Sequence, residues 1–268
     1  MKWCFHTSLV LPRGQLNFVE QWPLMNPNEL LFILASYLLF VLKIGPILME
    51  GRPPVQIKGF LIFYNLFKVI NSAVLTYTIF SYIIDNGLFP RKCEHDVLTL
   101  HFIASLYWKY MITKILDFFD TIFFVIRKKY NQVTFLHVYH HTFMVVMTWV
   151  CLKYDPSDHW AFLAFVNCVT HTIMYLYYAV AAMGPRFAKY LWWKKYLTMM
   201  QLTQFVLVIG VIVIKKATSE CPIHTSLYWI SLANLVLFIW LFVDFYNKRY
   251  SAKGSVPIGL ACTKQVTE

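Results

Sequence analysis

"FLHVYHHTFMVVMTWVCL", residues 135–152, places three histidines at one end of a long apolar run. A transmembrane helix needs about 20 predominantly apolar residues, and the segment 133–152 has that length. Ionisable side chains are costly inside hydrocarbon, so those found there usually have a function. The stretch therefore predicts a membrane helix, and it raises the question of what chemistry its histidines carry out.

Similar apolar runs recur along the whole chain, which is 59% hydrophobic and only 14% charged. Only helices and closed barrels satisfy the backbone in lipid, and these runs are too long and continuous for the strands of a barrel. We therefore expect an all-α polytopic membrane protein with seven transmembrane helices. The expected helices are 29–49, 60–84, 98–126, 133–152, 160–183, 191–214 and 225–246.

The net charge of +11 follows the loops between these runs. Lys and Arg gather in alternate loops, whereas the intervening loops, such as "KYDPSDH" (153–159), are neutral or acidic. This is the positive-inside pattern, so we expect no nucleic-acid partner. It predicts a non-cytosolic N-terminal segment, 1–28, a membrane domain, 29–250, and a cytosolic polar tail, 251–268.

Two of the six cysteines, Cys93 and Cys221, fall in loops on the predicted non-cytosolic side. An oxidising compartment would allow them to form a disulfide bond; the alternative is two unpaired thiols. The other four cysteines show no spacing typical of a zinc site.

The histidines of the opening stretch share one helix face. At about 100° per residue, His137, His140 and His141 fall within one third of the circumference. Interfacial histidines bound to lipid headgroups are the plainer alternative. A di-iron site would need roughly eight histidines in several boxes, and most of the nine present lie in loops or at the far ends of helices. We therefore expect no metal, with a single ion as the alternative left open, and we expect acid–base or nucleophilic chemistry.

Charged residues also occur in "KILDFFDT", 114–121. Lys114, Asp117 and Thr121 share a helix face, and Asp120 lies beside it. The carboxylates are expected to orient His137, His140 and His141, which together form the histidine box. A purely structural Lys–Asp pair is the alternative, and the two interpretations are compatible.

Two further segments carry polar side chains inside predicted helices. In "NCVTHTIMYLYY", 167–178, one face holds Asn167, His171, Met174, Tyr175 and Tyr178, which indicates a cavity lining. The alternative is a core histidine satisfied by its neighbours.

In "TMMQLTQF", 198–205, Thr198, Gln201 and Gln204 run down one side of the next helix. Buried amides of this kind either join helices or contact a substrate, and the sequence favours neither.

These four motifs, in this order and at this spacing, resemble those of the very-long-chain fatty acid elongases. "YNLFKVINS" (64–72) and "FYNKRY" (245–250) are also similar, so the resemblance covers nearly the whole chain. It implies six helices forming a closed barrel around a narrow acyl tunnel, with the first helix outside. It also implies an acyltransferase, a 3-oxoacyl-CoA synthase, that condenses a long-chain or very-long-chain acyl-CoA with malonyl-CoA. The products would be a 3-oxoacyl-CoA two carbons longer, CoA and CO2, in the first and rate-controlling step of the elongation cycle.

The resemblance also assigns roles to residues. His140 would take the acyl group in a ping-pong transfer, His171 would assist as base or second imidazole, and His137 and His141 would orient, backed by Asp117 and Asp120. Substrate contacts would come from Lys114, Asn167, Tyr175, Tyr178, Gln201, Gln204, Arg127, Lys128 and Lys194. No cofactor is implied beyond the two CoA substrates. The expected location is the endoplasmic reticulum membrane, with a lumenal N-terminus and a cytosolic C-terminus, and the expected partners are the lipid bilayer, a second copy of the chain and other enzymes of the cycle.

The chain departs from the family pattern at Asp117, where relatives usually have Glu, and it lacks the terminal lysine pair of many relatives. A Cys168–His171 dyad is a rival nucleophile within the sequence. A transporter or ion pathway is the rival class, since buried charges also mark ion paths. Against it, the chain shows no repeated Gly/Pro-interrupted helix.

Overall fold

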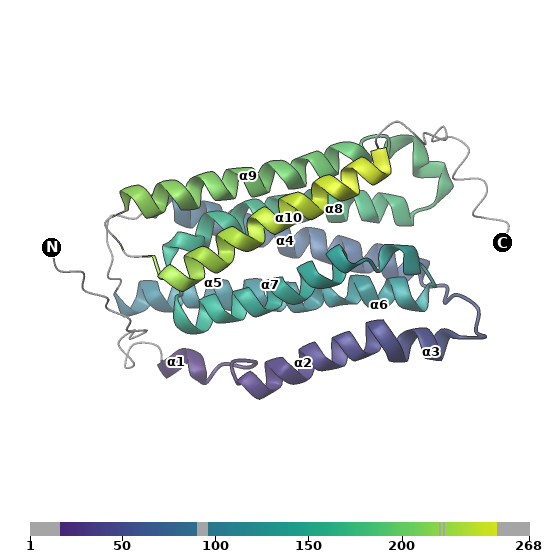
Figure 1. Cartoon of the computed structure of the whole chain (residues 1–268), viewed down its shortest axis with the longest axis horizontal. Coiled ribbons are helices and arrows are strands. Elements are labelled where there is room, and N and C mark those ends of the chain that lie inside the picture. Colours follow the sequence, from purple (N-terminus) through teal and green to yellow (C-terminus); the bar gives the residue numbers. More distant parts are fainter. Residues whose placement is uncertain (1–16, 90–95, 220, 222, 251–268) are drawn as a thin grey trace.

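The computed structural model describes residues 17–89, 96–219, 221 and 223–250, and within these ranges the chain is helical with no strand. Figure 1 shows the helices running side by side along one long axis. Their bounds are α1 Asn17–Glu20, α2 Pro27–Leu39, the π-helix η1 Phe40–Ile44, α3 Gly45–Met49, α4 Lys58–Asn86, α5 Val97–Leu116, α6 Phe118–Ile126, η2 Tyr130–Gln132, α7 Phe135–Tyr154, η3 Asp158–Trp160, α8 Ala161–Ala182, η4 Pro185–Tyr190, α9 Lys194–Thr218 and α10 Thr225–Tyr250.

Side-chain caps fix where several helices begin. The Asn26 side chain accepts a hydrogen bond from the backbone N–H of Asn28 at the start of α2, and Asp96 caps α5 in the same way. At the start of α7, the Thr134 side chain accepts from the backbone N–H of His137. Such caps satisfy N–H groups that have no partner within the helix. The cap at Thr134 places the histidine box in the first turns of α7.

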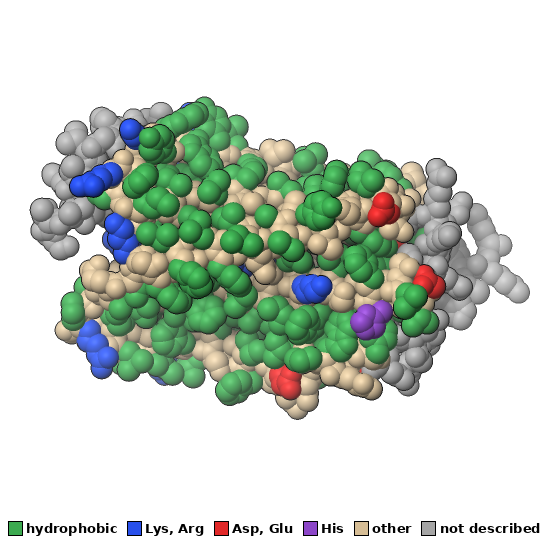
Figure 2. Space-filling model, turned by 180° about the vertical axis from the view of Figure 1, so that it is seen from behind, with side chains coloured by type: hydrophobic (Ala, Val, Ile, Leu, Met, Phe, Trp, Pro, Cys, Tyr) green, Lys and Arg blue, Asp and Glu red, His purple; other side chains and the backbone are tan. Residues whose placement is uncertain are grey.

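Six segments within the described ranges are long and apolar enough to cross a membrane, and all six match predicted helices within a few residues. They are Pro27–Met49, Lys58–Asn86, Phe135–Tyr154, Asp158–Ala182, Lys194–Thr218 and Thr225–Tyr250. The chain is thus a multi-pass membrane protein. Figure 2 agrees, because hydrophobic side chains cover most of the visible face and the visible Lys and Arg lie mostly toward its left end.

The remaining predicted span, 98–126, is not one continuous helix. α5 ends at Leu116, and the backbone tightens so that the Asp120 N–H bonds the Asp117 carbonyl. Two side chains of α4 bond carbonyls at this break: Lys68 Nζ donates to the Thr113 carbonyl (2.9 Å) and Tyr64 OH to that of Leu116 (2.9 Å). The break therefore places Asp117 between helices rather than along one helix face.

The helices pack in pairs. α4 lies along α8, α5 along α7, and α9 along α10, while η1 and α3 contact α6 (Figure 1). Cys221 is buried and disulfide-bonded, but Cys93, its predicted partner, lies outside the described residues, so this pairing stays a prediction. Most of the predicted terminal segments, 1–16 and 251–268, also lie outside them.

Candidate active site

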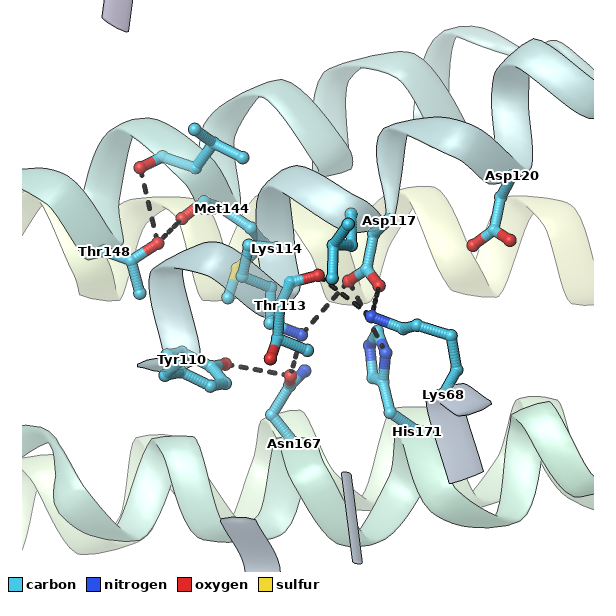
Figure 3. A network of polar contacts seen from close by, with 12 residues as sticks. Lys68, Tyr110, Thr113, Lys114, Asp117, Asp120, Met144, Thr148, Asn167 and His171 are labelled. Carbon is cyan, nitrogen blue, oxygen red and sulfur yellow. Dashed lines mark hydrogen bonds and ion pairs between the residues drawn. The ribbon is translucent and has the colours of Figure 1, made fainter. Parts of the chain in front are cut away.

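A buried charge network surrounds the break after α5 (Figure 3). Asp117 is 1% exposed, and its Oδ1 lies 2.5 Å from Lys68 Nζ. Lys114 Nζ lies 3.4 Å from Oδ2 of the same carboxylate. Buried ions in a membrane protein are costly unless they are paired, and this arrangement pairs one carboxylate with two ammonium groups drawn from different helices.

The amide of Asn167, on α8, has a fixed orientation. Its Oδ1 accepts hydrogen bonds from Lys114 Nζ (2.6 Å) and from Tyr110 OH (2.9 Å). With the oxygen held by two donors, the amide nitrogen is the end left to donate to another group.

Tyr175, one helical turn beyond His171, joins the two carboxylates of the predicted motif. Its hydroxyl lies 2.9 Å from Asp117 Oδ1 and 2.6 Å from Asp120 Oδ2. A phenol has one hydrogen, so Tyr175 donates to one carboxylate at a time. This residue, predicted to line a cavity and to contact the substrate, is fully buried inside the charge network.

His171 lies beside this network without a hydrogen bond to it. Its Nδ1 is 3.7 Å from Asp117 Oδ2, and this buried nitrogen has no hydrogen-bond partner among the described residues. A buried polar atom without a partner calls for an explanation, and a role in chemistry is one.

The three box histidines form a row of imidazoles at the start of α7. The ring centroids of His137 and His141 are 4.3 Å apart, those of His141 and His140 are 5.4 Å apart, and His140 packs on Phe238 of α10 at 5.1 Å. His137 Nε2 lies 3.0 Å from the Thr121 hydroxyl.

The expected pairing of carboxylates with box histidines is not what the structure shows. Because the helix breaks after Leu116, Asp117 points toward Lys68 and His171 (Figure 3), and the hydrogen-bond partner of His137 in the described chain is a threonine. The two carboxylates therefore contact Tyr175 and His171 of α8 and not the box histidines.

A narrow cavity of about 70 Å³ lies beside the box, between α5, α7, α8, α9 and α10. It is lined by Tyr107, Tyr110, His140, Phe143, Met144, Met147, Thr148, Cys151, Trp160, Leu163, Ala164, Asn167, Gln204, Phe205, Val208, Ser231, Asn234, Leu235 and Phe238. His140 is the one imidazole of this lining. From His140 to Cys151, α7 advances about 16 Å at 1.5 Å per residue, so the cavity is long as well as apolar.

The other predicted contact residues are spread more widely. Gln204 lines the cavity, and its Oε1 is buried without a hydrogen-bond partner in the described chain. Gln201 Nε2 instead contacts Met174 Sδ at 3.7 Å, and Tyr178 is 38% exposed.

The predicted basic contacts lie outside the cavity. Arg127 and Lys128 follow the end of α6, and Lys194 is exposed at the start of α9. These positions leave them near the ends of helices.

Lys68 was not among the predicted site residues, although it lies inside an apolar helix, a position where a lysine signals function. Tyr110 was not predicted either, because its sequence neighbourhood carries no such signal. Cys168, the rival nucleophile, packs in an apolar cluster with Leu75 and Leu106 and does not line the cavity.

The chain is similar to known proteins over most of its length. Residues 22–257 match the model of the ELO family, described as the GNS1/SUR4 family. The chain is 40% identical over 240 residues to "Very long chain fatty acid elongase 4" of Homo sapiens, covering 87% of this chain and 74% of that protein. It is 40% identical over 239 residues to "Very long chain fatty acid elongase 7" of Drosophila melanogaster, covering 86% and 71%. It is 34% identical over 253 residues to "Very long chain fatty acid elongase 1" of Mus musculus, covering 89% and 88%.

Proposed function

The chain belongs to the ELO (GNS1/SUR4) family of fatty acid elongases, and from that premise we propose that it is a 3-oxoacyl-CoA synthase. Its substrates are a long-chain or very-long-chain acyl-CoA and malonyl-CoA. The observation that carries this proposal is the position of His140, an imidazole at the wall of a long apolar cavity. An apolar slot suits a fatty chain, and a neutral imidazole suits attack on a thioester.

In the first half of the reaction, a His140 nitrogen attacks the thioester carbonyl carbon. The N–C bond forms as the C–S bond breaks, and CoA leaves as a thiolate that takes up a proton. His171 is the candidate base for the proton that His140 loses, because its Nδ1 is buried beside the Asp117 carboxylate without a hydrogen-bond partner in the described chain. Splitting the transfer into two steps is the usual advantage of covalent catalysis.

In the second half, malonyl-CoA loses CO2, and the electron pair of the broken C–C bond forms an enolate. The enolate carbon attacks the acyl carbon and the N–C bond to His140 breaks, so that a 3-oxoacyl-CoA two carbons longer results. The released His140 nitrogen takes back the proton that His171 held, which restores the starting enzyme. Asn167 is the candidate donor to the developing oxyanion, because Lys114 and Tyr110 hold its oxygen and leave its nitrogen to donate. A preorganised donor of this kind lowers the barrier where negative charge develops.

We further propose that α5 and α6 together make the seventh crossing and that α4–α10 enclose the acyl cavity. The family supports a location in the endoplasmic reticulum membrane and the first, rate-controlling place in the elongation cycle. The basic loops support a lumenal N-terminus. Arg127, Lys128 and Lys194 are then candidates to hold the CoA phosphates from the cytosolic side.

The test uses the purified chain in detergent with an acyl-CoA alone. Wild type should release about one equivalent of CoA and gain the mass of one acyl group on the peptide containing His140, and added malonyl-CoA should then release CO2 and the longer product. His140→Ala should lose both the adduct and the product, whereas His101→Ala, at an exposed histidine stacked on Phe18, should keep both. Normal elongation by His140→Ala would refute the nucleophile assignment, and a need for sealed vesicles would favour a transporter.

A further inference from the structure

Two hydroxyl groups, those of Tyr37 and Thr121, connect α2 to the histidine box. Tyr37 OH lies 2.9 Å from Thr121 Oγ1, and Thr121 Oγ1 lies 3.0 Å from His137 Nε2. Tyr37 is 4% exposed and Thr121 is fully buried, so the first of these bonds is shielded from water, whereas the bond to His137 is partly buried. The contact joins three helices, α2, α6 and α7.

The hydrogen bond between these two hydroxyl groups has a preferred direction. Thr121 is the hydrogen-bond partner that the described chain offers to Tyr37. If Tyr37 accepted from Thr121, its own hydrogen would be buried without an acceptor, which is unfavourable. Tyr37 therefore donates to Thr121, which leaves the Thr121 hydrogen free to donate to His137 Nε2. In a neutral imidazole that accepts this bond, the remaining hydrogen lies on Nδ1.

Close packing holds α2 in the register that this contact requires. The rings of Tyr37 and Phe118 stack in parallel, with centroids 3.9 Å apart and planes inclined by 9°. Further along, a Cβ built on Gly45 would lie 2.7 Å from a side-chain carbon of Val125, so α3 touches α6 at a point where only glycine fits. The π-helix η1 lies between these two contacts and changes the helix phase from one to the other.

The contact leads on to the cavity through the row of imidazoles. His137 packs on His141, and His141 packs on His140, which lines the cavity. We propose that Tyr37 is a positioning residue that acts through Thr121 to fix the ring orientation and the hydrogen placement of His137. Through the row of imidazoles it thereby also fixes the position of the His140 ring. The α2 helix then belongs to the active site and is more than a membrane anchor. This inference rests on the proposed function of the box.

Matched variants test the inference in the detergent elongation assay. Tyr37→Phe keeps the ring and removes the hydroxyl, so kcat should fall about two- to tenfold, the factor expected for one hydrogen bond, with KM unchanged. Thr121→Val should lose at least as much, and Thr121→Ser, which keeps the hydroxyl, should restore activity. Tyr82→Phe removes a buried hydroxyl bound to Asp158 at the far end of α4 and should leave kcat unchanged.

A double variant separates positioning from packing. If Tyr37 acts through Thr121, then Tyr37→Phe should have no further effect on kcat in the Thr121→Val background. Losses that multiply in the double variant would show that Tyr37 acts on its own, and this would overturn the inference.

A second measurement does not depend on activity. Diethyl pyrocarbonate modifies free imidazole nitrogens, and peptide mass spectrometry reports the rate at His137. Modification should be fastest in Thr121→Val, intermediate in Tyr37→Phe, and equal in wild type and Tyr82→Phe. Equal rates in all four proteins would overturn the inference. If the four proteins show this order of modification rates but the wild type does not elongate acyl-CoA, the proposed function is contradicted and the positioning role of Tyr37 stands.

Discussion

Replacing Lys68 by Met should destabilise the fold strongly. The change removes the ammonium 2.5 Å from Asp117 and leaves that carboxylate buried with Lys114 at 3.4 Å as its remaining ammonium partner. It also removes the donor to the Thr113 carbonyl at the helix break. Loss of one partner of a buried ion pair typically costs about 3–5 kcal/mol, which corresponds to a fall in Tm of roughly 6–20 °C for a chain of this size.

The assay is thermal unfolding of the purified protein in detergent. Lys248→Met is the matched control, because Lys248 pairs with Asp244 at 2.7 Å on the exposed face of α10, where such pairs contribute about 0.3–0.5 kcal/mol. The double variant Lys68→Met/Asp117→Asn should lose less than the sum of its single variants, since it removes both charges. A Lys68→Met protein whose Tm falls no further than that of Lys248→Met would refute the reasoning about the buried network.

Three further predictions follow from single contacts. Asn167→Asp keeps an oxygen for Lys114 but removes the amide hydrogens, so kcat should fall by about 10²–10³ with Tm nearly unchanged; a loss below tenfold would exclude an oxyanion role. Cys168→Ala should lower stability by about 1 kcal/mol and retain the acyl adduct, because the thiol packs in an apolar cluster, and loss of the adduct in a folded protein would restore the cysteine mechanism. Gly45→Ala should cost about 1–3 kcal/mol through its clash with α6, whereas Gly59→Ala, which meets nothing within 4 Å, should be neutral or stabilising; equal unfolding temperatures would contradict the close packing of α3.

The helices and the histidine box could be predicted because their signals are local. Apolar length places six spans within a few residues, and the cap residue Thr134 lies three residues before His137 in the sequence. The grouping of His137, His140 and His141 follows from helix geometry alone.

The partners of the polar residues could not be predicted in this way. The meeting of Lys68 with Asp117, and of Tyr37 with Thr121, depends on how separate helices rotate and cross, which no local pattern encodes. The break after α5 escaped prediction for the same reason, because the apolar pattern runs through it and the side chains that bond its carbonyls belong to α4. For Tyr175, the helix face was predicted from the sequence, but its hydrogen bonds to Asp117 and Asp120 were not.

The donation of hydrogen bonds from α4 to the broken helix has a consequence for biogenesis. The Leu116 carbonyl accepts from Tyr64 OH, and a carbonyl left without a partner in lipid is costly, so the α5–α6 segment is a poor substrate for insertion on its own. Because α4 precedes this segment in the chain, we expect Tyr64 to be in the bilayer already when the segment with the break emerges. A circular permutant that begins at α5 would have to enter the membrane without this helper, and we expect it to be retained by the translocation machinery or degraded.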